Sequence, residues 1–134
     1  MEVKVSTENG RVPVTVLHVD GNIDSSTHES FQAKVDELIK NGARHFLIDL
    51  AHTQFVSSAG LRTFNDIFNQ LRALQPDPNL SDEDLKRGIS AGTYKSPHLK
   101  LLNLSNNART SFEMSGFDMY IETYTDMQTA IASF

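Results

Sequence analysis

The sequence predicts an α/β domain with a mixed, mostly parallel sheet and the element order ββαβαβαβα. Short runs of alternating or continuous apolar residues, typical of strands, take turns with segments whose apolar residues recur at helical spacing. An Asn-Gly pair near the N-terminus joins the first two runs, which indicates an antiparallel hairpin at one edge of the sheet. A chain of 134 residues suffices for one hydrophobic core, so we expect residues 1–134 to form a single domain.

The first two strands are predicted on either side of the Asn9-Gly10 turn. Val3 and Val5 alternate with charged residues, as in a short, half-exposed strand. Pro13 fits the beginning of the second strand, where a missing N–H is tolerated. Residues on one face of that second strand are Val12, Val14, Val16 and His18.

Two amphipathic helices are predicted before and after the buried strand HFLIDL, residues 45–50. The first helix follows a capping box formed by Ser26 and Glu29, and Gly42 ends it. The second follows the turn FVSSAG, residues 55–60. The apolar positions are Phe31, Val35, Leu38 and Ile39 in the first helix, and Leu61, Phe64, Ile67, Phe68, Leu71 and Leu74 in the second.

Residues 75–97 interrupt the alternation of strands and helices. They contain three of the four prolines and show no long apolar periodicity. We interpret the segment as an extended insertion, in which Ser81 to Asp84 could cap a short helix that ends at Gly88. Loops of this length are functional or mobile. Two interpretations stay open: a tolerated surface insertion, or an added contact for a partner.

The C-terminal part continues the alternation of strands and helices. LKLLNL (99–104) predicts a buried strand, and a short helix follows, capped by Ser105 and ended by Gly116. MYIETY (119–124) predicts the last strand. Residues 125–128 are expected to cap a final helix, whose apolar residues are Met127, Ile131 and Phe134.

Composition narrows the classes of function. The net charge of −5 and the lack of a Lys/Arg cluster argue against nucleic acid as a partner. No apolar run approaches the roughly 18 residues of a membrane span, and the charged N-terminus is unlike a signal peptide. The chain has no cysteine, which excludes thiolate metal sites and suits a cytoplasmic location.

The stretch FVSSAGLR (55–62) is the candidate site. It forms a strand-to-helix turn at the C-terminal end of a central strand, where sites collect in α/β sheets. The unpaired N–H groups and the dipole of a helix start favour an anion there, so a phosphoryl group on Ser58 would be tolerated. Gly60 is expected to keep the backbone approachable, and Ala59 to leave the hydroxyls unshielded. The alternative is that Ser57 simply caps the helix.

The sequence lacks the motifs of common enzyme classes, which argues against an enzymatic role. A hydrolase nucleophile elbow would read G-x-S-x-G, but Val56 precedes the two serines and no glycine stands two residues before either. Neither a zinc-binding HExxH pattern nor a glycine-rich phosphate loop occurs, so neither a metal nor a cofactor is expected. A histidine base stays possible, since five are present: His18, His28, His45, His52 and His98.

Three segments make the sequence resemble the single-domain STAS anti-sigma-factor antagonists of bacterial partner-switching pathways. These are DGNIDSSTHESF (20–31), FLIDLAHTQFVSSAGLRTF (46–64) and LKLLNLSNNARTSFEMSGFDMYIETYTDMQTAI (99–131). The resemblance implies a non-enzymatic protein that binds an anti-sigma factor serine kinase and thereby releases a sigma factor. It also implies that the kinase phosphorylates the serine of the turn and that a phosphatase reverses this.

Carried over by position, the phosphoacceptor is Ser58, with Ser57 as second choice. The residues expected to face the partner are Asp24, Thr27, Ser57, Ala59, Gly60 and Leu61. The sequence departs from the family pattern where Ser57 replaces the usual Asp, where Ala59 replaces a frequent Ser, and where residues 75–97 lengthen a short connection. Other roles stay open: a STAS scaffold within a signalling complex, or a module that binds a small molecule or nucleotide.

Overall fold

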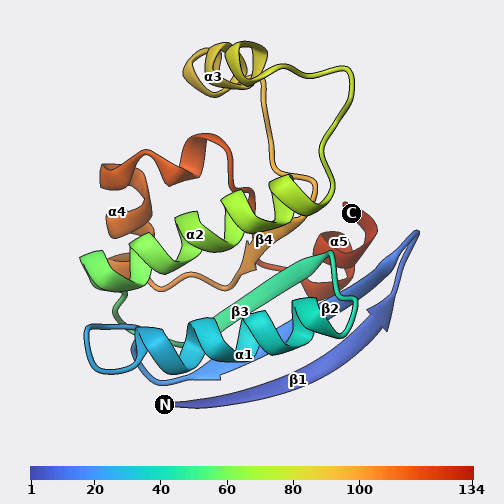
Figure 1. Ribbon diagram of the computed structural model, residues 1–134. Coiled ribbons are helices and arrows are strands. Elements are labelled where there is room, and N and C mark those ends of the chain that lie inside the picture. The colour runs from blue at the N-terminus through green and yellow to red at the C-terminus, as the bar shows by residue number, and fades with distance from the viewer.

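The computed structural model describes all 134 residues and contains one five-stranded sheet with the spatial order β1-β2-β3-β4-β5. β1 pairs with β2 in antiparallel fashion, and the remaining neighbours are parallel (Figure 1). The central strand is β3, as predicted. The strands are β1 (Glu2–Asn9), β2 (Pro13–Asp20), β3 (Phe46–His52), β4 (Leu99–Leu102) and β5 (Thr123–Tyr124).

Five α-helices connect and cover these strands, and they confirm the mixed α/β class. α1 and α2 lie side by side over one face of the sheet, whereas α3 stands apart above α2 (Figure 1). The helices are α1 (His28–Lys40), α2 (Ser58–Leu74), α3 (Asp82–Ala91), α4 (Asn106–Ser115) and α5 (Met127–Ala132), with a short 3₁₀ turn η1 (Phe117–Met119).

The alternation of side chains along the strands divides the core between the two faces of the sheet. On the helix-covered face, Leu17 and Ile48 join the large cluster with Phe31 and Phe64, whose ring centroids lie 5.6 Å apart. On the other face, a smaller cluster packs beneath α5, through Val14, Val16, Leu47, Leu102 and Ala130. Burying each large apolar side chain contributes about 1.5–3 kcal/mol, so the first face dominates stability.

The face beneath α5 also holds a buried lysine that fixes the C-terminal end of the chain. The Lys100 ammonium donates to the Ser133 carbonyl at 2.9 Å and lies 3.4 Å from a carboxylate oxygen of Glu122. Nearby, the rings of His45 and His98 lie 5.3 Å apart. Burial is the main cause that lowers the pKa of each histidine below its usual value of 6.5, so both are neutral at pH 7.

The predicted Ser26 cap is wrong, and the cap of the last helix lies at the second residue of the predicted segment; in both places a carboxylate is the cause. Ser26 does not cap α1, because the Asp24 carboxylate accepts both its N–H (2.9 Å) and its hydroxyl (2.7 Å). The N-cap residue is Thr27, without a side-chain cap. At α5, Asp126 caps the helix by accepting the Thr129 N–H at 2.8 Å, one position after the start of the predicted 125–128 segment. In both places a carboxylate, the stronger acceptor, determines the local geometry.

Residues 75–97 contain the predicted helix, which is longer than expected. Ser81 and Asp84 form the predicted capping box, but α3 continues past Gly88 and ends at Gly92, whose φ is +74°. Leu85 is the only fully buried residue of this helix. The last strand is shorter than predicted, because residues 117–119 form η1 and leave only Thr123–Tyr124 to pair with β4.

Candidate functional site

The turn after β3 begins α2 as the sequence predicts. Ser57 has extended backbone angles (φ −79°, ψ 176°), and its Oγ accepts the Gly60 N–H at 3.3 Å, which is N-cap geometry. Leu61 donates its N–H to the Ser57 carbonyl at 2.8 Å. The backbone N–H groups of Ser58 and Ala59 donate to no group of the protein, as expected for a first helical turn.

Two loops are clamped together at this end of the sheet. Ile23, in the loop between β2 and α1, forms an isolated parallel bridge with Val56. Its N–H donates to the Phe55 carbonyl at 3.2 Å, and its carbonyl accepts the Ser57 N–H at 2.9 Å. The Asn22 side chain adds a bond from the Phe55 N–H at 3.1 Å. The turn therefore has a fixed shape before anything binds to it.

Gly60 is needed for packing, not for the approachable backbone that the sequence suggested. It is buried, and a Cβ atom at this position would lie 2.6 Å from the Ile23 carbonyl oxygen and 2.8 Å from Val56 Cγ1. Real Cβ atoms essentially never make such contacts. A glycine here lets the first turn of α2 lie directly against the neighbouring loop.

The two serines differ in what surrounds their hydroxyl groups. Ser58 is exposed, and its hydroxyl makes no hydrogen bond within the protein, whereas Ser57 is half-buried and its hydroxyl holds the helix cap. A modifying enzyme could therefore reach Ser58 without breaking the turn. Leu61 and Ala59, also expected to face a partner, are half-buried beside it.

The loop before α1 supplies a fixed negative charge and an internal brace. Hydrogen bonds from the Ser26 hydroxyl and N–H are the main cause that lowers the pKa of Asp24 below its usual 3.8. Its carboxylate is therefore ionised at neutral pH. The Thr27 hydroxyl donates to the Asn22 carbonyl at 2.7 Å, so it supports the loop from within. Both residues remain partly accessible.

Sequence reasoning missed Phe55, whose side chain is 46% exposed although its backbone is held on both sides by the neighbouring loop. It predicted Ser105 as the cap of α4, which is confirmed, but missed the bond that the Ser105 hydroxyl donates to the Gln54 carbonyl at 2.9 Å. The one local signal for Phe55 is that an aromatic residue stands two positions before Ser57. No local pattern announces the contact between residues 54 and 105, which are far apart in the chain.

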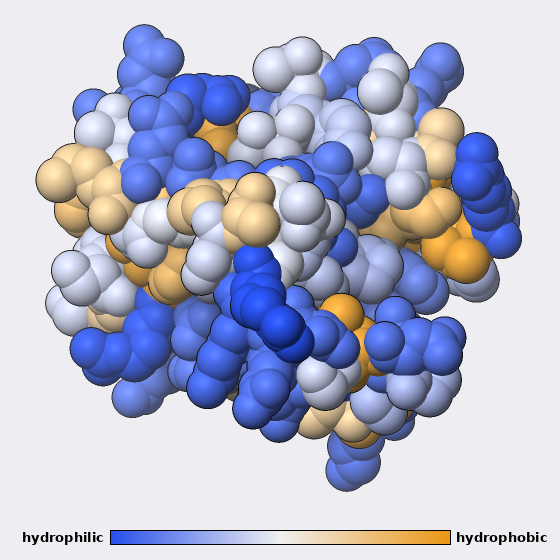
Figure 2. All heavy atoms as spheres, turned by 90° about the horizontal axis from the view of Figure 1, so that it is seen from above, coloured by the Kyte–Doolittle hydropathy of each residue, from blue (hydrophilic) through white to orange (hydrophobic).

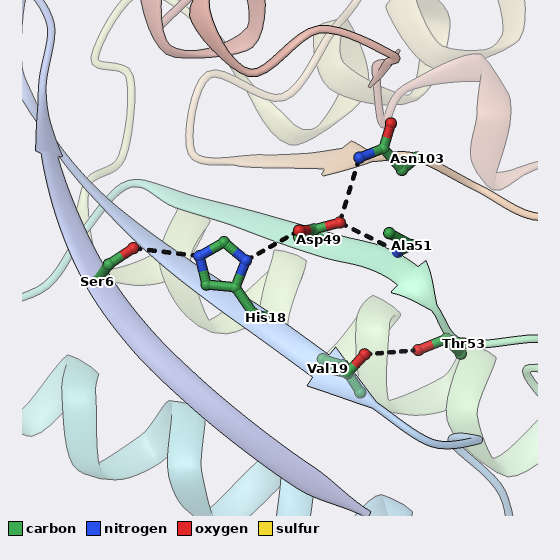
Figure 3. Close-up of polar contacts among 7 residues, drawn as sticks. All are labelled: Ser6, His18, Val19, Asp49, Ala51, Thr53 and Asn103. Carbon is green, nitrogen blue, oxygen red and sulfur yellow. Dashed lines mark hydrogen bonds and ion pairs between the residues drawn. The ribbon is translucent and has the colours of Figure 1, made fainter.

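A second polar cluster crosses the face of the sheet opposite α1 and α2 (Figure 3). His18 Nδ1 lies 2.9 Å from Asp49 Oδ2, and His18 Nε2 lies 3.3 Å from Ser6 Oγ. Asp49 Oδ1 accepts the Ala51 N–H at 3.0 Å and an Asn103 amide hydrogen at 3.4 Å. The residue types are those of a hydrolase triad, but Ser6 lies within an edge strand and not on a sharp turn. We interpret the cluster as a brace from β1 to the end of β4.

None of the helices combines the length and apolar character that crossing a membrane would require. Nowhere do three or more His, Cys, Asp or Glu side chains come together in a way that could hold a metal ion.

The fold and the turn define the class of this protein: it has the SpoIIAA-like α/β fold. The structure of the Bacillus cell fate determinant SpoIIAA in its phosphorylated form superimposes with a TM-score of 0.63 at 18% identity, over 97% of this chain and 96% of that one. An anti-sigma factor antagonist from Mycobacterium paratuberculosis gives a TM-score of 0.65 at 16% identity, over 97% and 94%.

The sequence comparison then identifies the family. Residues 4–76, more than half of the chain, match the model of the STAS domain, and the protein belongs to the STAS domain family. BtrV of Bordetella bronchiseptica, which is named as an anti-sigma factor antagonist, is 26% identical over 116 residues, or 87% of this chain and 82% of that protein. The family match ends at residue 76, where the insertion begins.

Proposed function

We propose that this protein is an anti-sigma factor antagonist, which binds an anti-sigma factor serine kinase while Ser58 is unmodified and is switched off by phosphorylation there. The main observation is the state of Ser58, whose hydroxyl is exposed and unbonded at the start of a helix with free N–H groups. The names of BtrV and of the M. paratuberculosis protein support the partner class. A serine phosphatase would reverse the switch.

The switch follows from electrostatics at the helix start. A phosphoserine carries about −1.5 to −2 charges at pH 7, and the free N–H groups of Ser58 and Ala59 together with the helix dipole stabilise that charge within the folded domain. A partner that covers the turn must instead remove water from the phosphate, which costs several kcal/mol unless the partner supplies cations. Modification would therefore change the affinity for the kinase without unfolding the turn.

The rest of the site suits protein binding rather than catalysis. Asp24 and Ser57 are engaged in local hydrogen bonds, and Thr27 braces its own loop. Phe55 adds an exposed aromatic group beside the acceptor serine. Rigid, partly apolar surfaces of this kind favour docking, because little conformational freedom is lost on binding. In this proposal the protein acts in the cytoplasm, needs no cofactor and performs no reaction.

The test uses the cognate kinase with ATP, followed by phosphopeptide mass spectrometry. We expect one phosphate on Ser58, none in a Ser58→Ala variant, and full modification of a Ser25→Ala control, which removes an exposed serine of the neighbouring loop. Phosphate found only on Ser57 or elsewhere would refute the assignment. Calorimetric titration should show that Ser58→Ala binds the kinase like the unmodified protein and that Ser58→Asp binds poorly. Equal affinities would exclude charge rejection.

A further inference from the structure

The first strand leaves one edge of the sheet unpaired. β1 spans eight residues and pairs only with β2, and Figure 1 shows it along the outer rim with no element beyond it. A strand edge of this length offers a row of free backbone donors and acceptors, which favours pairing with another strand. We propose that β1 is a dimerisation edge, which pairs in antiparallel fashion with β1 of a second copy of this chain.

The register of the hairpin shows which backbone groups are free. Thr15 donates its N–H to the His45 carbonyl at 2.8 Å, toward β3, so it cannot also pair with β1. Thr7 lies opposite Thr15, and its N–H and carbonyl therefore point away from β2, out of the sheet. The same holds for Val5 and Val3, which alternate with it along the strand.

Charge selects one register for the pairing of two copies. If Val5 lies opposite Thr7 of the second copy, the exposed Lys4 lies opposite Glu8 of that copy, and symmetry repeats this pair. Shifting the pairing by two residues one way places Val5 opposite itself and Glu2 opposite Glu8, which opposes like charges. Shifting it by two residues the other way places Lys4 opposite Gly10 and Glu8 opposite Ser6, so the ion pairs are lost. Of these three registers, only the first sets opposite charges against each other.

Lysine on an edge strand usually prevents unwanted pairing. Here the selected register places Lys4 opposite Glu8 of the second copy. Lys4 therefore favours pairing with a second β1 in this register and disfavours strands that lack a matching acidic residue. The two five-stranded sheets would join into one, and the two copies of β3 would run in opposite directions. Both Ser58 turns would then lie at opposite ends of the joined sheet, each free to meet a kinase.

Sedimentation equilibrium tests the proposal over concentrations up to about 1 mM, the range expected for a small interface. We expect concentration-dependent dimerisation, which Lys4→Glu or Glu8→Lys weakens by about 10-fold and which the Lys4→Glu/Glu8→Lys double variant restores. Lys86→Glu on α3 is the matched control, because it makes the same change of charge far from the edge. A monomer at every concentration overturns the proposal, as does a dimer that the single variants leave intact.

A second variant tests the backbone pairing independently of charge. Val5→Pro removes an N–H that β2 does not use, at a position where an edge strand tolerates proline. The variant should fold, as judged by circular dichroism, and remain monomeric. In the unmodified protein, hydrogen exchange of the Val5 and Thr7 amides should slow as concentration rises. Exchange that stays fast in a dimeric sample, or a dimer that survives Val5→Pro, would refute pairing through β1.

Discussion

Replacing Gly60 with alanine tests how closely the two loops of the site are packed. The added Cβ would lie 2.6 Å from the Ile23 carbonyl oxygen and 2.8 Å from Val56 Cγ1. The first contact is with backbone, so it can be relieved only if the clamped loop moves. Overpacking of this kind costs about 1–3 kcal/mol. Alanine gains about 1 kcal/mol over glycine in a helix, so we expect a net loss of about 1 kcal/mol, and at most about 2 kcal/mol, in the free energy of unfolding.

Urea denaturation measures this loss, and Gly92→Ala provides the control. Gly92 has a φ of +74° and open space around its Cβ position, so alanine there adds backbone strain of about 1 kcal/mol without a collision. In our proposal, Gly60→Ala should also weaken binding to the kinase, because the Ile23 loop must shift, whereas Gly92→Ala should leave binding unchanged. A Gly60→Ala variant as stable as the parent would show that the contact is not tight.

Three further outcomes are expected. Because His45 and His98 have lowered pKa values in the folded state, the unfolded chain binds protons first, and the free energy of unfolding should fall as pH drops below about 6.5. A double replacement of both by glutamine should flatten that slope in urea titrations at several pH values. Asp126→Ala removes the carboxylate that accepts a first-turn N–H of α5 at 2.8 Å, and should cost about 1 kcal/mol by the same denaturation assay; no change would mean that the cap is dispensable. Phe55→Ala should weaken kinase binding by more than about 1 kcal/mol in calorimetry while stability is kept. Leu74→Ala, with the same 46% exposure at the far end of α2, is its control, and equal affinity for both variants would contradict a role for Phe55.

The sequence predicts the helices and strands well, because the residues whose local pattern indicates a helix or strand also supply the apolar side chains of the core. The apolar stripe of α2 is buried at Phe64, Ile67, Phe68 and Leu71, and the Ser57 cap lies where expected. Leu74 continues the same periodicity but is exposed at the last residue of the helix. Periodicity reports which face of a helix is apolar, and only the tertiary structure determines how far along the helix that face is covered.

Contacts between distant parts of the chain could not be predicted. The bridge between Ile23 and Val56, the Ser105 bond to residue 54 and the Ser6–His18–Asp49 cluster all join segments separated in sequence. Each depends on strand order and register, which a single sequence does not specify. The role of Gly60 shows the same limit, because its small size is required by a loop that lies nearly forty residues earlier.

These long-range contacts bear on how a phosphorylation signal would be detected. The clamp between Ile23 and the turn fixes the backbone around Ser58, and Ser57 keeps the cap without adding a charge beside the proposed acceptor. The free N–H groups of Ser58 and Ala59 are in place before any phosphate arrives. A modified turn therefore has no physical reason to rearrange, and the partner would detect the charge and its water shell directly. In such a switch, selectivity depends on how completely the kinase surface covers the turn, which makes Phe55 and Asp24 the residues most suited to set it.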